Sequence, residues 1–580
     1  NQGSEVLKNL GECIYDSGGY FIIDGKEKVI IAQERITTNR LFTSKIKDDE
    51  VFSHKGLIKC TADVGETVLS PKSIEFYLVK NDTDSKQYLT KRGAILCSFK
   101  GINNNKIPLF VLFRALGMES DKDIYYSIFG DDLTDSEKIF FDNFIRPTIL
   151  SSSILYTQEQ AFEYISFLST YKTIDHVKSI LINEIFPNIS IFENKVKYLS
   201  YLVKQFINTC LNISLESDRD SYIYKRVDIS GYLLSQLFYE SYSKLTKYIR
   251  DSLDKTYNYG AWKSYNNYDY FINNNNIYKI IPSLIITKSF SRSLKGMWGL
   301  DDTDDPELGM VQDLSRISYI GFLSHLRNIN MPLDRSIKLT SPHRLHSQQY
   351  GIICPFATPD GASVGYLKNM ALLTKITSSS DVNYIIECLN DIGIILIENF
   401  NGYLNRNICK IFVNGSLYGL TKKPEYLIRV LRAYRRNNLF NLLTSLAWNI
   451  KENEIRIITD SGRCCRPLII LNTNSNKYTN WFDMLTGTIN VLGDNDKNDD
   501  IYYKSFYTSP KTLPQFANKT DNEILLELEK NSAIIEYIDI DEQDTLLVAM
   551  TKNDITPFHT HLEIHSSTMM SAISANIPLA

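Results

Sequence analysis

Short apolar runs flank two or three turn-forming residues at three places in the chain, and each pattern predicts a β-hairpin. In residues 19–33 the pair is Asp24-Gly25, which suits the tight primed turns that join antiparallel strands. Asn414-Gly415 stands between the two apolar runs of residues 410–420 in the same way. Residues 455–471 place Asp460-Ser461-Gly462 between two further runs and predict a third hairpin.

Apolar residues spaced three and four positions apart predict helices elsewhere. Residues 193–212 carry one such stripe, which indicates a core-facing helix. Residues 107–118 predict a strand that leads into a helix, and residues 232–249 predict a longer apolar helix. Arg429, Arg432 and Arg436 fall on one face of a further predicted helix. This face could bind nucleic acid, but far from the basic stretch described below we expect it to be solvated. The alternation of strands and helices favours a mixed, α+β, multidomain protein.

Composition sets the size and the broad class of the protein. A chain of 580 residues is too long for one core, so three or four domains are expected. Nine scattered cysteines without a CxxC pair indicate reduced thiols and an intracellular protein, nuclear or cytoplasmic, without a zinc ribbon. No apolar run is long enough for a membrane helix. The chain begins at Asn1 and ends without a polar tail, so both ends look cut.

Charge singles out one stretch in a chain whose net charge is −4. Residues 316–368 contain six basic residues against two acidic ones. The basic residues are Arg316, Arg327, Arg335, Lys338, Arg344 and Lys368, and the acidic ones are Asp334 and Asp360. This excess is compatible with phosphate binding, but composition alone favours a solvated loop face.

The residue order within this stretch is more informative than its charge. Residues 344–373 read RLHSQQYGIICPFATPDGASVGYLKNMALL, with a turn at Thr358-Pro359-Asp360-Gly361. They resemble the signature of the second-largest, beta-type subunit of multisubunit DNA-directed RNA polymerases. Asp360 stands where that family usually has Glu, and His343 where an Arg is common. Residues 12–35, 218–231 and 309–330 resemble further blocks of the same family, in the same order.

The resemblance implies an order of domains. It places the end of the protrusion in 1–35, the lobe in 36–228, the return to the protrusion in 229–295 and the fork in 296–375. The second and first external domains follow in 376–455 and 456–557. Residues 558–580 would begin the hybrid-binding segment of the catalytic core and be truncated there.

The resemblance also implies a function. The chain would be part of a nucleotidyltransferase that transcribes DNA into RNA, inactive alone and assembled with the largest and smaller polymerase subunits. Mg²⁺ would be held mainly by the largest subunit, and DNA, RNA and nucleoside triphosphates would be the other partners, with no membrane. The residues implied to contact nucleic acid are Gln312, Arg316, Arg327, Lys338, Arg344, Asp360 and Lys368. Arginine suits such contacts because its guanidinium stays charged and presents a planar fork.

Several alternatives remain open from the sequence. His559, His561, Glu563 and His565 would share one face of a strand and could hold zinc, although the family has a similar segment without a metal. Cys354 with His346 and Asp360 could form a hydrolase site, but Cys354 looks buried in an apolar run. The chain could also be a binding or scaffold module without catalysis. An AT-type residue bias makes a large DNA virus or a plasmid a plausible source.

Overall fold

The computed structural model describes residues 8–577 with gaps, and it divides the chain into two compact units. The gaps are residues 10, 12, 48, 50, 63–69, 81–92, 103–105, 132, 260–276, 300–308, 334–338, 472–519, 531–532 and 534. Unit 1 comprises Asn1–Arg35, Lys225–Ile376 and Ser566–Ala580. Unit 2 comprises Ile36–Tyr224 and Thr377–His565. Each unit is assembled from segments far apart in the sequence.

Unit 1 contains two small sheets. One has the order β1-β2-β10, formed by Phe21–Ile23, Lys26–Ile30 and Val311–Asp313. The other has the order β12-β11-β3-β9, formed by Leu367–Asn369, Asn328–Asn330, Ala32–Ile36 and Lys225–Asp228. β3 pairs in parallel with β11, whereas β12 pairs with β11 in the antiparallel sense. The predicted hairpin at Asp24-Gly25 is confirmed, because β1 pairs with β2 and both turn residues have positive φ.

Successive residues near the end of β2 face opposite ways, as the pleat of a strand requires. Val29 and Ile31 pack with Leu314 and Phe322 on one face. Ile30 packs on the other face with Leu233 and Trp298, among others. This second cluster anchors the long helix α8, Ser230–Tyr259, which confirms and extends the helix predicted over 232–249.

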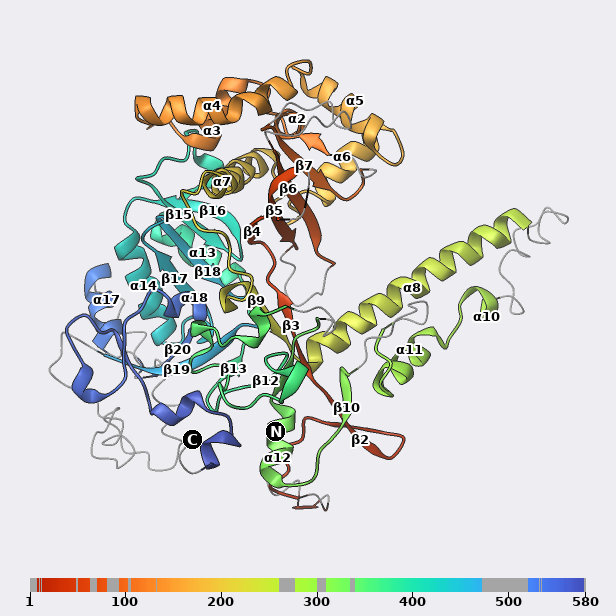
Figure 1. Ribbon diagram of the computed structural model, residues 1–580, viewed down its shortest axis with the longest axis vertical. Coiled ribbons are helices and arrows are strands. Elements are labelled where there is room, and N and C mark those ends of the chain that lie inside the picture. Colours follow the sequence, from red (N-terminus) through yellow and green to blue (C-terminus); the bar gives the residue numbers. More distant parts are fainter. Residues whose placement is uncertain are drawn as a thin grey trace. The chain divides into compact units, whose positions relative to one another are not determined.

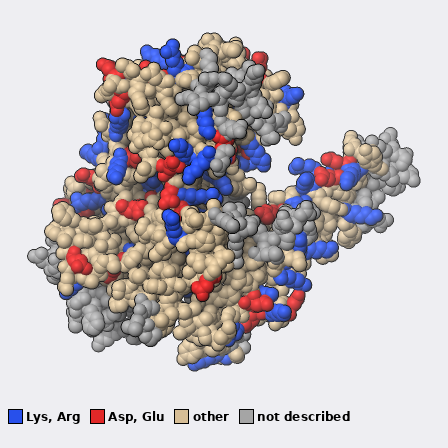
Figure 2. Space-filling model, in the orientation of Figure 1, with Lys and Arg blue, Asp and Glu red and all other residues tan. Residues whose placement is uncertain are grey.

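Helices α10 (Ile277–Ile280) and α11 (Ile285–Leu294) pack along α8 (Figure 1). Lys and Arg side chains on this helical arm are interspersed with acidic ones rather than gathered in one basic patch (Figure 2). On α8 the exposed basic residues Lys247 and Arg250 stand close to Asp251 and Asp254 in the sequence.

Unit 2 begins with an antiparallel sheet of order β4-β5-β6-β7-β8, formed by Leu41–Lys45, Phe52–Cys60, Lys72–Val79, Ile95–Phe99 and Ile107–Pro108. β8 runs directly into α2, Leu109–Ala115, as the sequence predicts. Four helices follow: α3 (Asp121–Phe129), α4 (Asp135–Ser151), α5 (Gln158–Leu168) and α6 (Ile174–Asn183). The predicted core-facing helix is confirmed as α7, Phe192–Cys210, and its apolar stripe is buried.

Two further sheets complete unit 2. The first has the order β14-β16-β15-β18-β17, formed by Ile395–Leu396, Ser416–Thr421, Cys409–Val413, Glu454–Ile458 and Ser445–Asn449. Helices α13 (Asn383–Ile392) and α14 (Pro424–Arg436) contribute to the core on this sheet. The second sheet contains β19 (Cys464–Ile470), β20 (Ile535–Asp539), β21 (Val548–Ala549) and β22 (His561–Leu562). Helices α17 (Asp521–Lys530) and α18 (Ile540–Gln543) lie in the same part of the chain.

One predicted hairpin is confirmed in this part of the chain and one is wrong. β15 and β16 pair across Asn414-Gly415, and both turn residues have positive φ. In contrast, β18 and β19 belong to different sheets, so residues 455–471 do not form a hairpin. The turn at Asp460–Gly462 passes the chain from one sheet to the next instead. A local turn signal cannot distinguish these outcomes, because it does not show that β18 pairs with β15 and β17 while β19 pairs with β20 and β22.

Candidate nucleic-acid interface

The first part of the predicted site is built on β10 and the helix that follows it. β10 extends the β1-β2 hairpin, with Gln312 opposite Val29. Helix α12, Tyr319–Leu326, begins at Ser318, whose hydroxyl accepts a hydrogen bond from the Gly321 amide. This side-chain cap satisfies a backbone donor that the first turn of a helix leaves without a partner. The loop between β10 and α12 carries Arg316.

A histidine on α12 orients Gln312. The Nδ1 of His325 accepts a hydrogen bond from the Ser315 amide at 3.2 Å, so the other ring nitrogen carries the proton. That nitrogen, Nε2, donates to Oε1 of Gln312 at 3.1 Å. The amide nitrogen of Gln312 donates in turn to the Gly309 carbonyl at 3.0 Å. Burial lowers the pKa of His325, which favours the neutral ring that this arrangement needs.

Arg316 is held at the surface by acids and a ring from the N-terminal segment of unit 1 and by a ring from α12. Its Nε and Nη2 donate to the two carboxylate oxygens of Glu27, each at 2.9 Å, and Nη2 also lies 3.4 Å from Asp16. The guanidinium packs over the rings of Tyr20 and Phe322, with its carbon 5.0 and 4.4 Å from their centroids. The hydrogen bonds to Glu27 raise the pKa of Arg316 and lower the pKa of Glu27. With 42% of its side chain exposed, Arg316 is a fixed surface cation.

Arg327 and Lys368 are placed differently, because both are engaged inside unit 1. The Nη2 of Arg327 donates to the carbonyls of Ala371, Leu372 and Thr374, at 2.6, 3.3 and 3.4 Å. Lys368 is only 6% exposed and donates to Oε1 of Glu34 at 3.0 Å. Lys225 contacts the other oxygen of the same carboxylate at 3.1 Å. These cations hold β3, β9, β12 and the chain after β12 together, so any contact of theirs with nucleic acid would compete with the fold.

Arg344 and Asp360 lie exposed on the loop that leads to β12. The remaining predicted residue, Lys338, lies outside the described residues. The loop closes on itself where His343 Nδ1 donates to the Val364 carbonyl at 2.8 Å. Gly365 makes this possible: it has a φ of +76°, and a Cβ there would lie 1.9 Å from the Pro342 carbonyl oxygen. The loop is therefore tightly closed, with Arg344 and Asp360 on its surface.

Comparison with known proteins shows which family the chain resembles. Residues 1–279 match the family model described as RNA polymerase beta subunit, and residues 312–376 and 411–472 match RNA polymerase Rpb2, domain 3 and domain 4. "DNA-directed RNA polymerase II subunit 2" of Arabidopsis thaliana is 31% identical over 100% of this chain and 46% of its own length. "DNA-directed RNA polymerase II subunit RPB2" of Encephalitozoon cuniculi is 29% identical over 99% of this chain and 47% of its own.

A polymerase III subunit shows the same relationship. "DNA-directed RNA polymerase III subunit RPC2" of Saccharomyces cerevisiae is 28% identical over 99% of the chain and 45% of its own length. The chain belongs to the family of second-largest subunits of DNA-directed RNA polymerases. It spans slightly less than half the length of these relatives. The family and mixed fold expected from the sequence are thereby confirmed, while the named domain boundaries and the viral or plasmid source stay predictions.

The histidine-rich tail of this polymerase-family chain is not arranged as a metal site. His561 is 2% exposed, and its Nε2 lies 3.1 Å from Oε2 of Glu536. Glu563 forms a buried ion pair with Arg466, and His559 Nδ1 is bonded within its own turn by Thr556. Across the described parts of the chain, no group of three or more His, Cys, Asp or Glu side chains could hold a metal ion. Only His561 and Leu562 form strand β22, so the strand alternation expected over residues 559–565 is wrong.

The residues proposed for a hydrolase are not joined either. Cys354 is 4% exposed, and its thiol contacts the Ser574 hydroxyl at 3.4 Å. Burial by itself raises the pKa of this thiol, but hydrogen bonds with Ser574 and Ser571 outweigh burial and lower it. No hydrogen bond among the described residues joins Cys354 to His346 or Asp360. A nucleophile needs access as well as a low pKa, so this geometry does not support the hydrolase.

Two features of the structure had no sequence signal strong enough to find them. The first is the set of acids that hold the predicted cations, Asp16, Glu27 and Glu34, which are distant from their partners in sequence. The second is a buried cluster centred on Arg435, which donates to Glu536 and Glu542 and to the Thr444 carbonyl. The neighbouring Arg429 and Arg436 bind Glu529 and Glu536 rather than water alone, so the expectation that they are merely solvated is wrong.

No described helix has the length and apolar character needed to cross a bilayer.

Proposed function

We propose that this chain serves as part of the second-largest subunit of a working DNA-directed RNA polymerase, which transcribes DNA into RNA. The observation that carries the proposal is the relationship to polymerase II and III subunits along essentially the whole chain. Because the chain spans less than half of each relative, the activity, the partner subunits and the nucleic acids all belong to this proposal.

Within that enzyme, the surface around Arg316 and Gln312 would contact the RNA–DNA hybrid. A cation fixed by Glu27 and by two rings loses little freedom when it meets a phosphate, which favours binding. Gln312 is likewise fixed by His325, and an oriented amide can accept or donate without demanding a charge. Arg344 and Asp360 would add surface contacts from the closed loop. Arg327 and Lys368 would serve chiefly by holding the strands that carry this surface.

Phosphoryl transfer in such an enzyme would use two Mg²⁺ ions to stabilise the attacking and leaving oxygens. The described residues of this chain do not fit a metal site of their own, since no three suitable side chains come together. The family resemblance implies that the ions would be held mainly by the largest subunit. The contribution of this chain would be to shape the nucleic-acid cleft and to contact the hybrid.

The proposal is tested by isolating the chain from its natural source through an affinity tag on the natural gene. We expect the largest polymerase subunit to co-purify, together with RNA synthesis that requires template DNA, Mg²⁺ and all four nucleoside triphosphates. A chain that purifies without a second large subunit, and binds DNA but incorporates no nucleotide, would instead support a non-catalytic binding module.

A further inference from the structure

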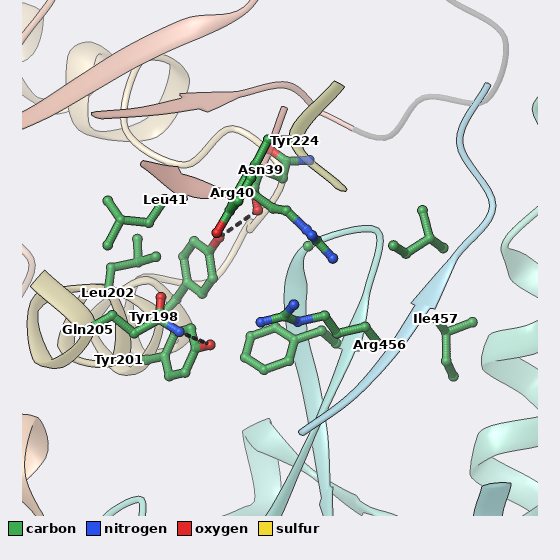
Figure 3. Close-up of a pocket in the computed structure, with 13 residues that line it drawn as sticks. Asn39, Arg40, Leu41, Tyr198, Tyr201, Leu202, Gln205, Tyr224, Arg456 and Ile457 are labelled. Atoms are coloured by element: carbon green, nitrogen blue, oxygen red, sulfur yellow. Dashed lines mark hydrogen bonds between the residues drawn. The ribbon is translucent and has the colours of Figure 1, made fainter. Parts of the chain in front are cut away.

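A small cavity lies inside unit 2, where three distant parts of the chain meet (Figure 3). Its volume is about 90 Å³. Helix α7 contributes Tyr198, Tyr201 and Gln205 to its wall. Arg40, just before β4, and Arg456, on β18, also line it. Tyr224, the last residue of the first segment of unit 2, completes this set. Figure 3 shows the guanidinium groups of Arg40 and Arg456 extending toward one another from opposite sides. This space is called the Arg40–Arg456 cavity below.

The two guanidinium groups that line the cavity both contact acids. Arg40 forms an ion pair with Asp541. Arg456 lies 3.0 Å from Glu454 and 3.8 Å from Asp541. Neither carboxylate lines the cavity, whereas both guanidiniums do, so the cavity itself presents positive charge.

The phenols that line the cavity are fixed by hydrogen bonds within unit 2, and Tyr198 donates to the Asn39 carbonyl at 3.4 Å. Burial raises the pKa of Tyr198 and Tyr201 well above the usual value, so both phenols stay neutral. The Tyr201 hydroxyl donates to Glu454 at 2.7 Å and the Gln205 amide donates to Tyr201, which fixes α7 to β18 at the cavity wall. The guanidinium carbon of Arg40 lies 5.9 Å from the centroid of the Tyr224 ring. These bonds hold the wall of the cavity in place before any ligand arrives.

We propose that the Arg40–Arg456 cavity binds one compact tetrahedral oxyanion of the phosphate class between its two guanidinium groups. Guanidinium forks match phosphate oxygens in geometry and charge, and each presents five N–H donors. The space is smaller than the cavity of about 150 Å³ that holds a benzene molecule, so a bare ion fits and a nucleoside does not. Bound there, the ion would tie together segments that lie some 400 positions apart in sequence.

The test is calorimetric titration of the full chain with inorganic phosphate, with adenosine monophosphate in a parallel titration. We expect saturable binding of one phosphate per chain, and no binding of the nucleotide at the same site. A second readout is protection of Arg40 and Arg456 from phenylglyoxal by phosphate, mapped by mass spectrometry on the unsubstituted chain. Arg406, an exposed arginine paired with Glu137, serves as the unprotected reference.

A matched pair of variants separates a specific site from the general stabilising effect of phosphate on folded proteins. At equal ionic strength, phosphate should raise the melting temperature of Arg406→Gln and of the natural chain by about 2–4 °C more than that of Arg456→Gln. Equal rises in all three proteins would overturn the proposal. If Arg456→Gln does not fold, the natural chain alone decides. The proposal is then overturned if phosphate shows no saturable binding or does not protect the two arginines. It is also overturned if adenosine monophosphate binds with the same affinity as phosphate.

Discussion

Arg316 in unit 1 and Arg435 in unit 2 make the same type of contact in opposite surroundings. Arg316 meets Glu27 through two parallel hydrogen bonds at the surface, where 42% of its side chain is exposed. Arg435 meets Glu536 and Glu542 with 1% of its side chain exposed. An exposed pair contributes little to stability, whereas loss of one partner from a buried pair leaves an uncompensated charge. The comparison assigns Arg435 to the fold, whereas Arg316 is the residue for which we propose a contact with nucleic acid.

The largest effect is expected from Arg435→Met. This change leaves Glu536 and Glu542 buried without their central cation, and it should lower the free energy of unfolding of unit 2 by about 3–5 kcal/mol. The measurement is the melting transition of the full chain followed by calorimetry, with Arg429→Gln, an exposed arginine of the same helix, as the control. If both variants melt like the natural chain, the buried cluster does not stabilise unit 2.

A smaller loss is expected from Lys368→Met in unit 1. Glu34 would keep Lys225 but lose the cation that fixes β12, so the cost should be about 2–3 kcal/mol, below the range for complete loss of a partner. Hydrogen exchange of the β11 and β12 amides should report it as faster exchange confined to unit 1. Faster exchange in unit 2 alone would contradict the assignment of Lys368 to this cluster.

Acid should weaken the buried cluster of unit 2. Burial raises the pKa of Glu536, but the charges of Arg435 and Arg436 outweigh burial and hold it well below the usual value. Because the pKa is lowered in the folded state, the stabilisation is fully present above the unfolded value of about 4.3 and is lost as the pH falls through the lower folded value. Melting temperatures measured from pH 6 to pH 3 should therefore fall less steeply in Glu536→Gln. Parallel slopes would show that Glu536 does not carry this acid sensitivity.

The smallest effect on folding is expected from Glu27→Gln. Its pair with Arg316 is exposed, so the melting temperature should change by no more than about 1 °C. The variant should nevertheless loosen Arg316, and in an assembled polymerase it should weaken retention of the RNA–DNA hybrid as salt is raised. A large loss of stability would show that the Glu27–Arg316 pair stabilises the fold, as the Arg435 cluster does.

What the sequence predicts and what it misses follow from the distance between interacting residues. The turns at Asp24-Gly25 and Asn414-Gly415 were predictable because the two residues themselves favour the required backbone angles. The false hairpin at Asp460–Gly462 carries a similar local signal, but β18 pairs with β15 and β17, and β19 pairs with β20 and β22. The partners of Arg316 and Lys368 lie 289 and 334 positions away, so no local pattern could show which cations are exposed and which are buried.

The most direct measurement compares Arg316→Gln with Arg429→Gln in the assembled polymerase. Both arginines are exposed and both bind one glutamate through Nε and Nη2, but only Arg316 stands on the proposed hybrid-contacting surface. Elongation on a preformed RNA–DNA hybrid at increasing salt should slow in the Arg316 variant and match the natural enzyme in the Arg429 variant. Unchanged elongation in both variants at every salt concentration would contradict the assignment of Arg316 to nucleic-acid binding.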